Sequence, residues 1–189
     1  MADADSFLGL NFRMHELTGA VAGAQLRKLP SILARLRESR ARLKAAIGPV
    51  PRARVRRCHD EEGDCATVLA YTFETAALAG AVAEGLGTIT LAASGKHNYA
   101  NIPQLARRAM PFDSCPQGGD ARPLRGTYEP GTLPRTEDLL ARTVALSVGV
   151  VDSYLGTGFG INVRSGEDEI ERAAERFARV AGAAAGALP

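Results

Sequence analysis

Apolar residues between Arg13 and Ile47 recur with helical spacing. These residues form one stripe along the predicted helix, at intervals that alternate between four and three residues: Leu29, Leu33, Leu36, Leu43 and Ile47. Arg40 occupies the remaining position of the stripe, between Leu36 and Leu43. Pro30 lies at the start of this stretch, where its missing N–H is tolerated, so it either joins two helices or kinks one. Gly48-Pro49 is a helix stop signal. Ahead of Pro30, small residues form one face that suits either a tight interface or routine packing: Gly19, Ala20, Gly23 and Ala24.

Apolar runs rich in β-branched and aromatic residues predict strands in the middle and later parts of the chain. These runs are Cys65–Phe73, Thr88–Leu91, Thr143–Val151 and Phe159–Val163. An Ala-rich stretch from Thr75 to Leu86, with Gly85 and Gly87 at its end, predicts a helix after the first of them.

Two further helices are expected after a proline-rich loop region at residues 95–135. One begins at Thr136, with acidic residues in its first turn, and runs to Ala141. The other runs from Glu167 to about Ala184 behind a Ser165 cap, with Asp168 in its first turn. Its buried stripe is predicted to be Ile170, Ala174, Phe177 and Val180 or Ala181.

This order of elements predicts an α+β fold, with a small mixed or antiparallel sheet covered by helices. We expect residues 1–48 to form an N-terminal motif with linker helices, and residues 49–189 to form a small α+β domain. A chain of 189 residues can bury roughly 70% of its unfolded surface and needs no disulfide or metal to fold.

Charge is distributed unevenly although the net charge is only +2. The segment Arg27–Arg57 holds eleven basic residues against one acidic residue, Glu38, so the rest of the chain is acidic. The segment has no aromatic residues for base stacking, which disfavours nucleic acid as a partner. We expect its arginines to lie on a solvated helix face or to pair with a protein.

No sequence feature predicts secretion or membrane insertion. The first five residues are acidic where a signal peptide would be basic, and the longest uncharged runs, such as Gly85–Gly95, are about half of a membrane span. Cys58, Cys65 and Cys115 make an odd count without a CxxC motif, and Cys58, His59 and Cys65 do not form a four-ligand zinc set. A reduced cytoplasmic protein without a metal site is expected.

No complete catalytic constellation is visible. The glycines of Gly156-x-Gly158-x-Gly160 resemble a phosphate loop, but they precede a predicted strand and not a helix, so the helix dipole is missing. The three histidines are scattered. The strongest candidate is Lys96-His97-Asn98-Tyr99, which places four hydrogen-bonding side chains in a loop; the alternative is a polar surface loop.

One N-terminal segment carries a specific resemblance. Gly9-Leu10-Asn11-Phe12-Arg13-Met14-His15-Glu16-Leu17 is followed by Ala20, Gly23, Gln25-Leu26 and Leu29. This pattern resembles the G-x-N-x-R-M-x-x-L-x-A-x-x-G-x-x-Q-L signature of the pyridoxal-phosphate sugar aminotransferases of the DegT/DnrJ/StrS family. The arginine-rich helix that follows resembles the family's linker helix. Looser matches agree in order: Val68–Phe73, His97-x-Tyr99, Leu133-Pro134-x-Thr136-Glu137 and Asp168-Glu169-Ile170-Glu171.

The resemblance implies the small C-terminal domain of a fold-type I aminotransferase acting on a keto-sugar or related carbocycle. In the family, the large domain precedes the signature and supplies the Schiff-base lysine, whereas only eight residues precede Gly9. None of Lys28, Lys44 and Lys96 matches the catalytic lysine, so the expected activity needs a large-domain partner. The alternative is a non-catalytic binding or regulatory remnant that docks on a full-length aminotransferase.

The resemblance also implies the site residues. Asn11 matches the residue that reaches the cofactor phosphate across the dimer, and Arg13 would stabilise the same turn or face the substrate. Lys96, His97 and Tyr99 match a loop near the substrate. Pyridoxal 5'-phosphate would be shared with a partner chain and not bound covalently here. The expected partner is a large-domain or full-length aminotransferase chain, or a second copy of this chain.

Overall fold

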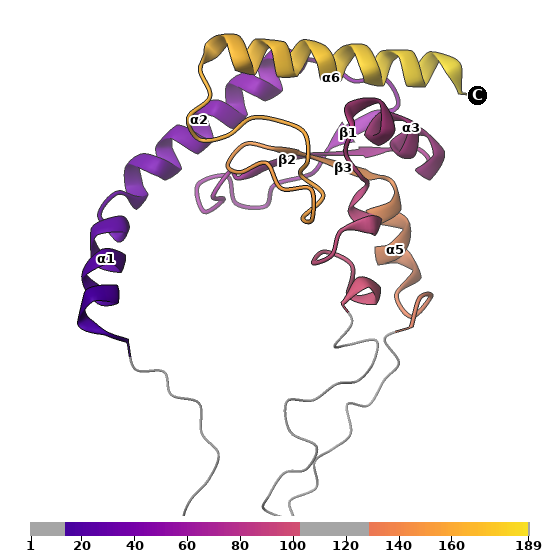
Figure 1. The fold of residues 1–189 in the computed structure, drawn as a ribbon. Helices are drawn as coiled ribbons and strands as arrows, with labels where there is room; N and C mark the ends of the chain where they lie inside the picture. Colours follow the sequence, from indigo (N-terminus) through magenta and orange to yellow (C-terminus); the bar gives the residue numbers. More distant parts are fainter. Residues whose placement is uncertain (1–13, 103–128, 189) are drawn as a thin grey trace, which may run out of the picture.

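The structure is a computed structural model that describes residues 14–102 and 129–188. Within these ranges the chain has an α+β fold, which confirms the predicted class (Figure 1). Three antiparallel strands pair in the order β1-β2-β3. They are β1 (Ala53–Val55), β2 (Val68–Phe73) and β3 (Thr143–Ser147). The pattern did not predict β1, because Arg54 is one of its three residues and Arg52 and Arg56 flank it.

Helices and two 3₁₀ turns surround this sheet. The helices are α1 (Glu16–Leu26), α2 (Leu29–Ile47), α3 (Ala76–Leu86), α5 (Pro134–Ala141) and α6 (Glu167–Ala187). The 3₁₀ turns are η1 (Leu91–Ala93) and η2 (Tyr99–Asn101). Figure 1 shows α6 running across α2 and above the sheet, while α1 extends from the far end of α2 away from the body.

The hydrophobic core lies where α2, α3 and α6 meet the sheet. The α2 stripe contributes buried Leu36, Leu43 and Ile47 to it. Phe177 of α6 is fully buried, and its ring lies 4.8 Å from the ring of Tyr71 in β2. The predicted α6 stripe is confirmed: its buried residues are Ile170, Ala173, Ala174, Phe177 and Ala181.

Pro30 joins two helices. It is the second residue of α2, and a turn at Arg27-Lys28 separates that helix from α1. Gly48 ends α2 with a φ of 67°, a left-handed value that favours glycine. The outer part of the predicted stripe is not covered: Leu29 is 41% exposed, so burial on α2 begins nearer Leu36.

The first predicted strand and the helix after it are present. β2 occupies Val68–Phe73 and not the whole of Cys65–Phe73. In α3, the Thr75 hydroxyl accepts a hydrogen bond from the Leu78 N–H at 3.2 Å, and Gly87 terminates the helix with a φ of 73°.

Two predicted strands are wrong. Thr88–Leu91 makes a single bridge, Thr90 to Val144, before the chain turns into η1. Phe159–Val163 likewise makes one parallel bridge, from Gly160 to Ser147. A side chain at Gly160 would overlap the Ser147 backbone, so the glycine permits this close approach. Close packing against Ser147 therefore explains the glycine at position 160 of the glycine-rich segment.

Two predicted helix starts are displaced. α5 begins at Pro134 behind Leu133, because proline suits the first helical position, and Thr136 lies inside the helix. α6 is capped at Gly166 and not at Ser165: the Gly166 N–H donates to Glu169 Oε2 at 3.1 Å. The Ser165 hydroxyl instead accepts from the Asn162 N–H at 3.1 Å. β3 also stops at Ser147, short of the predicted Val151.

Candidate functional site

The structure describes three of the five predicted site residues. Asn11 and Arg13 lie outside the described residues. Lys96, His97 and Tyr99 lie in the segment 94–101, which follows η1 and includes η2, and which we call the 94–101 loop.

Side-chain hydrogen bonds fix the backbone of the 94–101 loop. The buried Ser94 hydroxyl accepts from the N–H groups of Lys96 at 3.3 Å and His97 at 3.1 Å. Asn98 donates to the Ala92 carbonyl at 2.9 Å, and Asn101 donates to the same carbonyl at 2.7 Å. Because each side chain satisfies nearby backbone groups, the loop keeps one shape without a strand ladder.

A second segment of the chain supports the loop at Gly95. The Gly95 N–H donates to the Tyr154 carbonyl at 3.0 Å, and the Tyr154 hydroxyl donates to the Gly95 carbonyl at 3.3 Å. A side chain at position 95 would overlap the Tyr154 ring, so glycine is required for this contact. The side chains of Lys96 and His97 are exposed beside it. The loop therefore presents two basic side chains from a fixed backbone.

The side chain of Tyr99, unlike those of Lys96 and His97, is hydrogen-bonded to a distant segment of the chain. Its hydroxyl donates to the Glu137 carboxylate at the start of α5 and accepts from the Leu133 N–H at 3.2 Å. Glu137 also accepts from the Gly131 N–H at 2.7 Å. The Tyr99 hydroxyl, followed by the Gly131 N–H, lowers the pKa of Glu137 below its ordinary value. The Tyr99 hydroxyl therefore joins the loop to α5, and Lys96 and His97 are the members of the predicted set with exposed side chains.

The sequence pattern marked Asn98 as part of a hydrogen-bonding loop, but it did not mark four other residues that build this site. They are Ser94, Asn101, Glu137 and Tyr154. The local signal was present, since Ser and Asn around a glycine are typical of loops with side-chain-to-backbone bonds. No local signal marks Tyr154 or Glu137, because they lie 59 residues from Gly95 and 38 residues from Tyr99.

The described residues do not by themselves fit pyridoxal phosphate. Lys28 and Lys96 have exposed side chains, with nothing to enclose a ring beside the amine. Lys44 lines a cleft on α2, but no aromatic residue there can stack on a pyridine ring.

In residues 14–102 and 129–188, no group of three or more His, Cys, Asp or Glu side chains could hold a metal ion. None of the helices in the same ranges has the length and apolar character needed to span a bilayer. A comparison with models of known protein families finds none that matches the chain.

Proposed function

We propose that this chain is the C-terminal part of a pyridoxal-phosphate-dependent aminotransferase acting on a keto-sugar or related carbocycle, and that a large-domain chain completes it. The observation that carries the proposal is α1, which follows directly on the Asn11-x-Arg13 motif and none of whose residues is buried by the part of the chain that the structure describes. Its large apolar side chains are exposed, Leu17 by 78%, Val21 by 54% and Leu26 by 67%, and Met14 just ahead of the helix is 63% exposed.

A helix that residues 14–102 and 129–188 leave uncovered favours association with a partner. Its eleven residues are too few for a stable isolated helix, and exposed apolar groups favour association. The resemblance of residues 9–29 to the aminotransferase signature indicates what that partner is, because the large domain and the second subunit adjoin this segment in the family. Lys96 and His97, held on the 94–101 loop, are then candidates for contacts with an anionic or hydroxyl-bearing substrate.

Co-expression with a family large-domain chain that carries the Schiff-base lysine tests the proposal. We expect a complex that co-purifies, shows the absorption of bound pyridoxal phosphate and has aminotransferase activity. Leu17→Asp should abolish the complex, since it places a charge at an exposed apolar position of α1. Gln25→Asp, an exposed polar position on the same helix, is the matched control and should leave the complex intact.

The alternative, a non-catalytic remnant docking on a full-length aminotransferase, uses the same α1 surface. It predicts that the full-length enzyme is active without this chain. Complex formation with no dependence of activity on the chain would favour the remnant. The absence of any complex, with the chain a stable monomer, would contradict both.

A further inference from the structure

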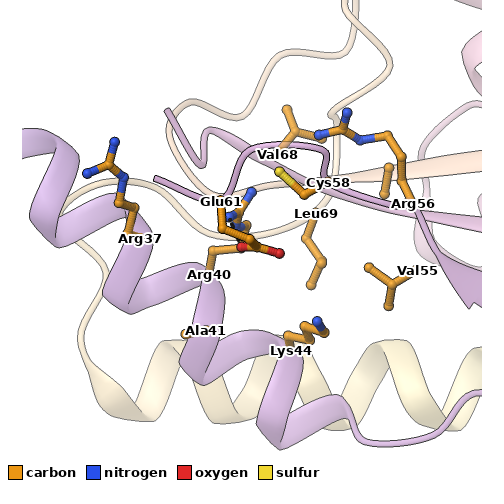
Figure 2. Close-up of a pocket in the computed structure, with 11 residues that line it drawn as sticks. Arg37, Arg40, Ala41, Lys44, Val55, Arg56, Cys58, Glu61, Val68 and Leu69 are labelled. Carbon is orange, nitrogen blue, oxygen red and sulfur yellow. Dashed lines mark hydrogen bonds and ion pairs between the residues drawn. The ribbon is translucent and has the colours of Figure 1, made fainter. Parts of the chain in front are cut away.

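A cleft of about 190 Å³ lies between α2, the end of β1 and residues 58–61, and the site proposed above does not use it. Figure 2 shows Arg37, Arg40 and Lys44 along α2, Arg56 on the opposite side, and the apolar side chains of Val55 and Leu69 between them. The cleft thus combines basic groups at its rim with an apolar floor.

The rim has an excess of positive charge. Arg40, with a side chain only 13% exposed, pairs with Asp64 and with Glu61 at 3.1 Å. Asp64 also lies 3.5 Å from the Arg56 guanidinium. Arg37 donates to the backbone carbonyls of Glu62 and Asp64, so no carboxylate neutralises it. The cationic side chains of Arg37, Arg40, Lys44 and Arg56 therefore outnumber the carboxylates of Glu61 and Asp64 by four to two.

Lys44 is the group best placed to bind a ligand. Its ammonium lines the cleft and has no hydrogen bond or ion pair with any residue that the structure describes. Arg37, Arg40 and Arg56 already contact residues 61–64, which precede β2. Their positions are therefore set before a ligand binds. An anionic group at Lys44 would gain a charge-assisted bond and would reduce the excess positive charge.

The floor indicates the rest of the ligand. Val55 presents a partly exposed aliphatic group in the cleft, whereas Leu69 is only 2% exposed. A small molecule with an apolar body covers Val55 and gains the free energy of that burial, which a bare inorganic anion does not. We propose that this cleft binds a small organic anion, with its phosphate or carboxylate at Lys44 and its apolar body against Val55.

Calorimetric titration of the full chain tests the proposal, with phenyl phosphate, benzoate and inorganic phosphate as probes. We expect phenyl phosphate or benzoate to bind more tightly than inorganic phosphate, and the tighter of the two identifies the preferred anionic group. Lys44→Gln should weaken that binding about tenfold. Glu61→Gln should strengthen it about threefold, because it removes a negative charge from the rim.

Two variants serve as matched controls. Lys28→Gln removes an exposed lysine of the same basic segment outside the cleft, and Glu62→Gln removes the carboxylate next to Glu61 that does not line it. Neither should change the affinity. Binding that falls equally in Lys28→Gln and Lys44→Gln would overturn the proposal in favour of diffuse attraction. So would the absence of binding by both organic anions, or an affinity for inorganic phosphate equal to that for the tighter organic anion.

Discussion

Asp64 holds the loop between β1 and β2 against α2. Its carboxylate accepts from the Ala66 N–H at 2.9 Å, pairs with Arg40, and lies 3.4 Å from the Cys58 thiol. The Ala66 N–H, and then Arg40 and Cys58, lower the pKa of Asp64 from 3.8 to about 2. Because folding lowers this pKa, the associated stability is present above pH 3.8 and is lost as the pH falls toward 2.

Asp64→Asn should therefore lower the free energy of unfolding at pH 7 by about 2 kcal/mol and flatten its fall between pH 4 and pH 2, since one pKa unit corresponds to about 1.4 kcal/mol. Urea denaturation at a series of pH values measures both effects. Glu171→Gln, an exposed carboxyl on α6, is the control. An acid transition in Asp64→Asn as steep as that of the unmodified chain would show that other groups cause it.

The contact between α3 and α6 depends on a glycine. A Cβ at Gly85 of α3 would lie 2.7 Å from Val180 Cγ1 of α6, whereas a Cβ at Gly80, on the same helix, would have open space. Gly80→Ala should stabilise the chain by up to about 1 kcal/mol through helix propensity. Gly85→Ala gains the same propensity but crowds the contact, so it should be about 1–3 kcal/mol less stable than Gly80→Ala. Chemical denaturation of the two variants measures the difference; equal stabilisation would mean that α6 accommodates the methyl group without strain.

At the scale of the molecule, the described residues form a packed body and a helix, α1, that this body does not cover. α6, α2 and α3 pack with the sheet, and α1 extends from that body in Figure 1 without a buried residue. Hydrogen exchange should therefore differ greatly between the two parts in the isolated chain. Amides of α1 should exchange at rates close to those of an unfolded peptide, because a helix of eleven residues is marginal by itself. Amides of β3 should exchange only through global unfolding.

Binding of the proposed large-domain chain should slow exchange in α1 and leave β3 unchanged. Sedimentation at several concentrations, run alongside the exchange measurement, gives the oligomeric state. Slow α1 exchange in a chain that sediments as a monomer would contradict an uncovered helix. Slow exchange that appears only with self-association would identify a second copy as the cover.

The sequence by itself determined the elements whose signals are local. Periodicity and capping residues predict three of these elements. They are the buried stripe of α2 (Leu36, Leu43 and Ile47), the helix α3, and the buried face of α6 that includes Phe177. These signals are local because a helix satisfies its own backbone groups within four residues. The four hydrogen-bonding side chains of Lys96-His97-Asn98-Tyr99 likewise marked a candidate loop from local sequence, and the structure leaves Lys96 and His97 exposed there.

Only the tertiary structure decided which segments pair, and which charges remain available. Thr88–Leu91 reads as a strand but makes one bridge, while Ala53–Val55 is a strand despite its arginines, because pairing depends on whether a free edge lies alongside. The contact of Tyr99 with Glu137, and the ion pair of Arg40 with Asp64, depend equally on chain segments brought together by folding. Within the basic segment Arg27–Arg57, folding pairs several arginines with residues 61–64 and leaves Lys44 facing a cleft. Periodicity carries no information on such pairings, since their free energy comes from desolvation and contact between distant residues.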